Sequence, residues 1–192
     1  EGATMNLTHS SGVHERSPSL SPDGKWIAYF SDSTGEYELY VRSLDAKAEI
    51  KQLTKDGKTF YFGQAWSPDS KRIAYVDKAA NIHLVTLETG ETKIIDTDPW
   101  ANPPGVSWSN DSDWITYAKS GDNQAAAIWL YQISKDTKSK VTSGVFGDGS
   151  PAFDRKGEYL YFVRNIDFSS PQYEDLGNSF VYSDSARLMV AP

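Results

Sequence analysis

The sequence predicts an all-β protein, because one strand-forming motif recurs four times at a regular spacing. The motif is clearest in SPDGKWIAYF, residues 21–30. Pro22 sets φ for a tight turn, and Gly24 accepts the positive φ that such a turn needs. The apolar, aromatic run that follows is short and closely bounded by turn residues, which is typical of a buried strand and not of a helix.

The motif returns as SPDSKRIAYV (67–76), SNDSDWITYA (109–118) and DRKGEYLYFV (154–163). The large side chains just before each turn are 46, 42 and 45 residues apart: Leu20, Trp66, Trp108 and Phe153. A four-stranded propeller blade takes about 40–45 residues. The sequence therefore predicts a β-propeller with four blades of four antiparallel strands, either a small closed ring or part of a larger one.

Each repeat has room for four strands, taken here in chain order. First strands are expected at 17–21, 64–67, 105–109 and 151–154, and the apolar runs after the turns are the second strands. Third strands are expected at 37–41, 82–85, 128–131 and 187–190, after turns rich in Asp, Gly and Asn. Fourth strands end at Thr54, Asp96 and Thr142. The predicted blades are 9–54, 55–96, 97–142 and 143–190 of one domain, 1–192.

Two segments depart from the simple repeat. Residues 5–8 repeat the fourth-strand pattern, because Thr8 precedes Thr54 by 46 residues. We expect them to complete the last blade, which would join the two ends and remove an exposed sheet edge. An aromatic-rich insertion at 165–185 separates the second and third strands of the last repeat. We expect it to pack on the propeller or on a neighbouring domain.

Composition excludes several classes of partner and site. The chain has 26 acidic and 19 basic residues and a net charge of −7. That balance argues against nucleic acid and against an anionic membrane surface, which both require a basic face. The chain has no cysteine, so it has no disulfide, no thiolate nucleophile and no cysteine-based metal site.

Motifs for catalysis are also lacking in the sequence. No G-x-S-x-G elbow is present, and the nearest match, residues 105–109, falls on a predicted strand. The three histidines are His9, His14 and His83, and His83 lies on a predicted third strand. Neither H-E-x-x-H nor a calcium-binding loop occurs. The sequence predicts no catalytic residue, no metal and no cofactor in this chain.

Residues 6–41, with GVHERSP at 12–18 and the SPDGK-x-IAY signature, resemble the β-propeller repeats of tricorn-type serine proteases. The wider class includes TolB-like and WD-type repeats. The segment YFVRNIDF, 161–168, is similar to the family's last blade before its catalytic half. The resemblance covers residues 6–192.

This resemblance implies a non-catalytic propeller module that binds, gates or channels peptides for a cytoplasmic protease with a downstream catalytic domain. The alternative is a stand-alone, TolB-like scaffold for protein interactions, periplasmic or secreted. A propeller lactonase or lyase is a third possibility, but the predicted inner strands carry Ser, Ala, Gln and Trp in place of converging carboxylates or histidines.

Eight residues are candidates for binding a peptide or protein partner: His14, Glu15, Arg16, Tyr61, Phe62, Trp100, Arg164 and Asp167. The first three precede an inner strand, which places them at the channel mouth. Arg16 could hold a peptide carboxylate with both arms of its guanidinium, or it could tie two blades together through an Asp or Glu. Tyr61, Phe62 and Trp100 are expected either to line a hydrophobic rim or to pack between blades. Arg164 and Asp167 are expected to bind or to anchor the insertion.

Assembly follows from the blade count. Four blades taken from a larger ring would expose two hydrophobic blade faces. Two copies could bury these faces by pairing into one eight-bladed ring, which would give a homodimer. Four blades that close on themselves would instead give a monomer.

Overall fold

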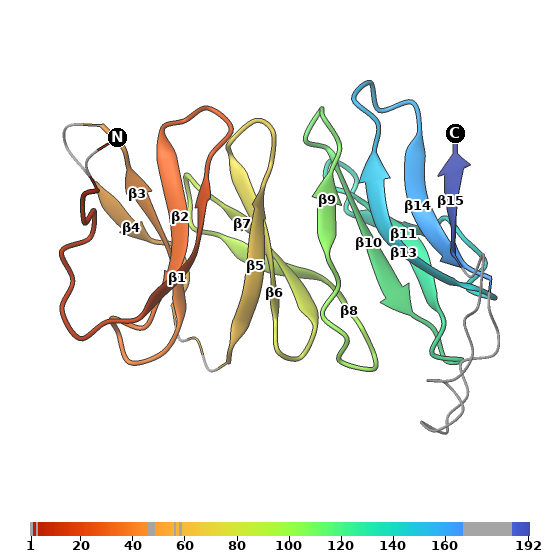
Figure 1. The fold of residues 1–192 in the computed structure, drawn as a ribbon, viewed down its shortest axis with the longest axis horizontal. Coiled ribbons are helices and arrows are strands. Elements are labelled where there is room, and N and C mark those ends of the chain that lie inside the picture. Colours follow the sequence, from red (N-terminus) through yellow and green to blue (C-terminus); the bar gives the residue numbers. More distant parts are fainter. Residues whose placement is uncertain (1, 3, 46–48, 56, 58, 167–185) are drawn as a thin grey trace.

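The computed structural model describes residues 2, 4–45, 49–55, 57, 59–166 and 186–192, and its elements are all β-strands. They form four antiparallel sheets, blades 1 to 4, each made of consecutive strands (Figure 1). Blade 1 contains β1 (Glu15–Leu20), β2 (Trp26–Ser31), β3 (Glu38–Ser43) and β4 (Ile50–Gln52). Blade 2 contains β5 (Tyr61–Trp66), β6 (Arg72–Asp77), β7 (Asn81–Thr86) and β8 (Thr92–Thr97). Blade 3 contains β9 (Val106–Trp108), β10 (Trp114–Ser120), β11 (Ala126–Gln132) and β12 (Thr137–Lys140). Blade 4 contains β13 (Gly147–Phe153), β14 (Leu160–Asn165) and β15 (Ala186–Ala191).

The predicted all-β propeller architecture is confirmed. Three blades have four strands, and the fourth has three within the described residues. In that part of the chain no helix is long and apolar enough to cross a membrane.

The repeated turn works through its first residue. The Ser21 hydroxyl donates to Asp23 at 2.6 Å and accepts the backbone N–H of Trp26 at 2.9 Å, so it holds the start of β2 against the end of β1. Ser67 and Ser109 repeat these bonds in blades 2 and 3. In blade 4 the carboxylate of Asp154 replaces the hydroxyl and accepts the N–H of Tyr159 at 2.9 Å.

The core lies between the blades and not within them. Alternate residues of the second and third strands, such as Phe30 and Leu39, are fully buried and pack against the next blade. Separate hydrophobic clusters fill the spaces between blades 1 and 2, 2 and 3, and 3 and 4. Each blade is therefore stabilised by its neighbours, as expected for a repeat that cannot bury its own apolar face.

The blades follow one another in an arc, with β1 against β5, β5 against β9 and β9 against β13 (Figure 1). We call these four the inner strands. Their antiparallel pairing puts the repeated turns at one end of every blade, the upper rim in Figure 1, and the starts of the inner strands at the other, the lower rim. The chain termini lie at opposite ends of the arc in this view.

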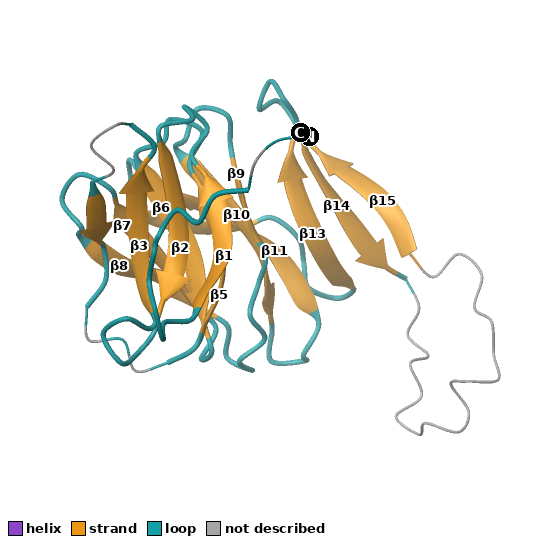
Figure 2. Ribbon diagram, turned by 60° about the vertical axis from the view of Figure 1, so that its left-hand side comes forward, coloured by secondary structure: helices purple, strands orange, loops and turns teal. Residues whose placement is uncertain are grey.

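Residues 5–8 lie elsewhere than predicted. They form no strand, and they line a pocket on blade 1 with Pro18, Ile27 and Tyr29. The hydroxyl of Thr8 donates to Glu15 at 2.6 Å. The N-terminus lies at the blade 1 end of the arc, away from blade 4 (Figure 1). Among the described strands, β15 therefore forms the edge of its sheet (Figure 2). The spacing of the repeats in the sequence does not specify how far residues 5–8 lie from blade 4.

The inner strands also begin earlier than predicted in blades 1, 2 and 4. β1 starts at Glu15 and β13 at Gly147. Each strand contains a shift in register, and its pairing with the second strand continues on the N-terminal side of that shift. At these points Ser17 and Ser150 adopt positive φ of 53° and 51° ahead of a proline. Such a bulge breaks the alternation that marks a strand in sequence.

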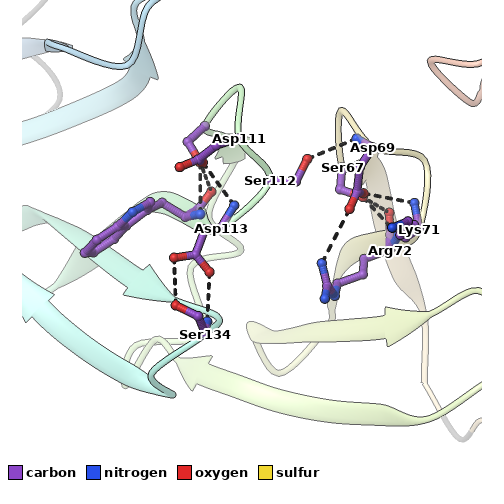
Figure 3. Close-up of polar contacts among 10 residues, drawn as sticks. Ser67, Asp69, Lys71, Arg72, Asp111, Ser112, Asp113 and Ser134 are labelled. Atoms are coloured by element: carbon purple, nitrogen blue, oxygen red, sulfur yellow. Dashed lines mark hydrogen bonds and ion pairs between the residues drawn. The ribbon is translucent and has the colours of Figure 1, made fainter.

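A second serine in the turn links consecutive blades at the upper rim. Ser112 of blade 3 accepts the backbone N–H of Asp69 of blade 2 at 3.0 Å (Figure 3). Ser70 accepts that of Asp23 in the same way, also at 3.0 Å. Both serines adopt positive φ, near 60°, where glycine is normally favoured. Blades 1 and 4 have Gly24 and Gly157 at this position. The serine therefore adds a hydrogen bond between blades at a position where its backbone conformation is strained.

Replacing Ser112 separates these two contributions. Ser112→Ala keeps the strained φ and removes the acceptor of the part-buried hydrogen bond from the Asp69 N–H, so we expect a loss of about 1 kcal/mol in the free energy of unfolding. Ser112→Gly removes the same bond but relieves about 1 kcal/mol of strain, so its loss should be smaller. Urea unfolding monitored by tryptophan fluorescence measures both. Equal losses would show that the backbone strain at Ser112 has no energetic weight.

Candidate functional site

Seven of the eight candidate residues are described, and all of them lie at the lower rim. Glu15, Tyr61 and Gly147 are the first residues of their inner strands and pair with the last residues of the neighbouring strands. Trp100 belongs to the connection from β8 to β9, and its indole N–H donates to the carbonyl of Gly121, in the turn after β10, at 2.9 Å. Asp167 and nearly all of the insertion 165–185 lie outside the described residues.

Arg16 ties blade 1 to blade 2, although not through a carboxylate. Its guanidinium donates to the carbonyl oxygen of Tyr61. The guanidinium carbon lies 3.7 Å from the ring centroid of Phe60, 4.5 Å from that of Tyr37 and 5.3 Å from that of Phe30. Burial lowers the pKa of Arg16. This aromatic surround favours the structural alternative for Arg16, with cation–π contacts in place of the expected Asp or Glu.

His14 and Glu15 hold the chain that leads into β1. The backbone N–H of His14 donates to Asp32 at 2.7 Å, and its ring Nδ1 is bonded to the hydroxyl of Tyr37. Glu15 accepts hydroxyl hydrogen bonds from Thr8 and from Ser10, the latter at 3.0 Å. The two side chains are thus engaged in local contacts at the lower rim.

Tyr61 and Phe62 have different environments although they are adjacent. Tyr61 is 6% exposed, its ring stacks on Phe30 at 5.5 Å, and burial raises its pKa. Phe62 is 38% exposed and meets Phe60, 41% exposed, edge to face at 5.4 Å. Trp100 is 48% exposed. Tyr61 is therefore a core residue, and among the described residues of the lower rim Phe60, Phe62 and Trp100 are exposed aromatic side chains.

Phe62 also lines a cleft between the inner strands of blades 2 and 3. The cleft measures about 500 Å³, and its lining is mostly apolar. It is formed by Phe62, Gly63, Gln64, Ala65, Val76, Pro103, Pro104, Gly105 and Val106, which we call the proline cleft. Gln64 spans from here to blade 1, where its amide N–H group donates to the carbonyl of Ala28 at 3.1 Å and to the hydroxyl of Ser19 at 3.2 Å. Its carbonyl oxygen is buried and has no partner within the described residues.

Sequence reasoning missed Phe60, Tyr37 and the proline cleft. The run FYF at 60–62 was the available signal for Phe60, since a strand that alternates faces exposes one of two neighbouring aromatics. The cleft had no comparable signal, because its two walls come from different blades.

Arg164 is engaged inside blade 4. Its guanidinium donates to both oxygens of Asp148, Nε at 2.7 Å and Nη2 at 3.0 Å. The Asp148 side chain is fully buried, and Arg164 lies over the rings of Phe146 and Phe162. The hydrogen bond to this carboxylate raises the pKa of Arg164. Arg164 therefore stabilises the lower end of blade 4.

Groups suited to covalent catalysis are not brought together in the described part of the chain. The histidine rings with hydrogen bonds contact Tyr37 and Asp77, and no serine or threonine hydroxyl is bonded to a histidine there. Among the same residues, no three His, Asp or Glu side chains are grouped so that they could hold a metal ion. What the lower rim presents is an apolar and aromatic surface beside a cleft.

Comparisons with known proteins agree with this architecture. A family model of the tricorn protease second β-propeller domain matches residues 1–192. Tricorn protease homolog 1 of Streptomyces coelicolor is 26% identical over 97% of this chain, and a putative tricorn-like protease C-terminal subunit of Sulfurisphaera tokodaii is 27% identical over 87%. The alignments cover 18% and 19% of those proteins, so the chain spans less than a fifth of their length.

Solved structures show the same fold. A crystal structure of the tricorn protease superposes with a TM-score of 0.68 over 75% of this chain and 15% of that one, at 19% identity. A putative TolB from Agrobacterium tumefaciens superposes with a TM-score of 0.58 over 80% of this chain and 55% of that one, at 22% identity.

Proposed function

Because this chain belongs to the tricorn protease second β-propeller family, we propose that it is a non-catalytic module that binds peptides and guides them toward a catalytic region elsewhere in a tricorn-like protease. The observation that carries the proposal is the exposed aromatic surface beside a cleft at the lower rim. There Phe62 is exposed beside the proline cleft, and Trp100 is exposed on the loop that leads to the same cleft.

Apolar and aromatic surface with few charges suits an extended peptide. Aromatic rings and prolines supply large contact area at a small cost in side-chain entropy. The bulge in β5 leaves Gly63 outside the regular ladder and beside the proline cleft, where a peptide backbone can hydrogen bond to it. Such contacts are tolerant of sequence, which a guiding surface requires.

The test is peptide binding by the isolated chain. A fluorescein-labelled unstructured peptide with leucine and phenylalanine side chains should bind, as measured by fluorescence anisotropy. Phe62→Ala and Trp100→Ala should each weaken binding by about tenfold, since each removes a large apolar contact. Tyr159→Ala is the matched control, because Tyr159 is 44% exposed at the upper rim. Equal losses in all three variants, or no loss in the first two, would contradict the proposal.

The blade 4 end of the arc has an exposed apolar face that is relevant to how the chain assembles. The outer face of blade 4 exposes Tyr161, Val163, Leu188 and Val190, which are paired across β14 and β15 and so lie together. Leu188 is 74% exposed, and β15 forms the free edge of its sheet within the described residues. We propose that further propeller blades cover this face: those of a longer polypeptide where one exists, and those of a second copy for the isolated chain.

The isolated chain is accordingly expected to run as a dimer. Light scattering across a concentration series should give twice the 21.3 kDa chain mass. Leu188→Lys places a charge in the buried face and should return the mass to that of one chain. Ile94→Lys, at a 56% exposed position on an outer strand of blade 2, should leave the dimer intact. A single-chain mass for the unaltered protein at every concentration would exclude this assembly.

A further inference from the structure

A second pocket lies between blades 1 and 2, outside the proline cleft. It measures about 540 Å³, within the size range of small-molecule sites. Its floor is aromatic, with Tyr61, Tyr75 and His83 from three strands of blade 2. Its walls are mostly polar and carry one charged side chain, Lys55; they are formed by Gln52, Leu53, Thr54, Lys55, Thr89, Gly90 and Thr92. We call it the His83 pocket.

His83 is held rigidly in this floor. Its ring stacks on Tyr75 with centroids 4.8 Å apart and planes 4° from parallel, and Tyr61 meets it edge to face at 6.4 Å. Its Nε2 lies 2.9 Å from the carboxylate of Asp77. That carboxylate is also held by the backbone and side-chain N–H groups of Asn81, at 2.9 and 2.8 Å. The imidazole orientation is therefore set before any ligand arrives.

The Asp77 contact determines which ring nitrogen carries the proton. A carboxylate only accepts hydrogen bonds, so the neutral imidazole keeps its proton on Nε2 and leaves a lone pair on Nδ1. Burial would raise the pKa of Asp77, but the hydrogen bonds from Asn81 and His83 outweigh it and the pKa lies below its usual value. Nδ1 has no partner within the described residues and is not sealed from solvent. His83 thus lines the pocket in a fixed orientation, and Nδ1 is its acceptor nitrogen without a partner among the described residues.

Two carboxylates near the floor disfavour an anionic ligand there, and the one cation in the lining, Lys55, belongs to the wall. Asp77 lies behind His83, and the nearly buried Glu38 lies close enough to Tyr61 and Tyr75 to contribute to raising their pKa values, although burial is the larger cause. Glu38 is held there by the backbone N–H of Gly57 at 2.6 Å. A neutral ring with a hydroxyl donor matches both the acceptor and the negative surroundings.

We propose that the His83 pocket binds a neutral phenolic ring, such as a tyrosine side chain, whose hydroxyl donates to His83 Nδ1. The ring occupies the pocket beside His83, where Tyr61 and Tyr75 contribute the small exposed parts of their side chains to the lining. Asp77 acts as a positioning residue that fixes the tautomer and orientation of His83. This site is separate from the lower-rim surface proposed to guide peptides, so either proposal can fail alone.

The test compares two neutral ligands that differ by one hydroxyl, N-acetyl-tyrosinamide and N-acetyl-phenylalaninamide. Isothermal titration calorimetry should show the tyrosine ligand binding about five- to tenfold more tightly, the effect of one neutral hydrogen bond. Long-range proton–nitrogen NMR should show an unprotonated Nδ1 in free His83 whose signal moves when that ligand binds.

Variants assign the preference to the ring nitrogen. His83→Phe keeps a stacking ring and removes the acceptor, so both ligands should bind with the affinity of the phenylalanine ligand for the unaltered chain. His9→Phe, the same change at an exposed histidine outside the pocket, should keep the preference. Equal affinities in the unaltered chain, a preference that survives His83→Phe, or no binding of either ligand up to about 10 mM would overturn the proposal. The last result excludes the pocket itself, and none depends on peptide binding at the lower rim.

Discussion

Arg164→Met is expected to lower the free energy of unfolding by about 3–5 kcal/mol, the usual cost of removing one partner from a buried ion pair. The Asp148 side chain is fully buried and both of its oxygens accept from Arg164. Methionine fills much of the same volume but leaves that carboxylate without its cation. Urea unfolding should show a lower midpoint with an unchanged slope.

Two further variants separate this effect from a general loss of arginine. Arg72→Met removes the ion pair between Arg72 and Asp69, two side chains that are each 31% exposed. The loss in the free energy of unfolding should therefore stay below about 1 kcal/mol. Adding Asp148→Leu to Arg164→Met removes the orphaned charge and should recover much of the loss. If Arg72→Met cost as much as Arg164→Met, burial of Asp148 would not be the cause.

Asp96→Ala is expected to cost about 3 kcal/mol, because Asp96 is the shared acceptor at the boundary of blades 2 and 3. Its carboxylate accepts from Lys119 and from the hydroxyl of Tyr117, both at 2.8 Å, and from Lys138 at 3.0 Å. Tyr117 is fully buried, so the substitution leaves its hydroxyl without an acceptor. Tyr117→Phe in the Asp96→Ala background removes that orphan and should restore part of the stability.

The same carboxylate makes stability depend on pH. Burial would raise the pKa of Asp96, but the hydrogen bonds from Lys119, Tyr117 and Lys138 outweigh it, and the pKa falls below its usual value. A carboxyl with a lower pKa in the folded state contributes stability above its unfolded pKa of about 3.9, and the contribution is lost as pH falls through the folded pKa.

The difference in stability between the unaltered chain and Asp96→Asn should therefore be largest near pH 7 and shrink below about pH 4. Urea unfolding at several pH values measures it. Asp122→Asn, on an exposed turn, should change stability by less than about 0.5 kcal/mol at every pH. A difference for Asp96→Asn that is constant with pH would contradict the assignment.

The repeat could be predicted because its signal is local. The turn residues around Ser21 and the apolar run after them specify a hairpin without help from the rest of the chain. The predicted third strand at 187–190 became β15, Ala186–Ala191, although it follows a long insertion. The bulges at Ser17 and Ser150 were not predicted, since their positive φ values depend on how the inner strands pair.

The sequence predicted where the candidate residues lie in the fold, but not which residues they contact. Counting back from the repeated turns placed six of the described candidates at the entries to the inner strands, which lie at one rim, but the partners of Arg16 and Tyr61 come from the neighbouring blade. Arg16 meets Phe60 and the carbonyl of Tyr61, and no spacing within blade 1 predicts the residues of blade 2 that face it. The pairing of His83 with Asp77 likewise depends on the register of β6 and β7.

By itself the sequence determined the strand order, the four repeats and the resemblance to tricorn propellers, because turn chemistry and apolar alternation act over a few residues. Only the tertiary structure decided that the arc stays open and that residues 5–8 lie on blade 1. It also decided which aromatic side chains are exposed. Those outcomes depend on packing between blades, which brings together residues more than 40 positions apart, such as Arg16 and Tyr61.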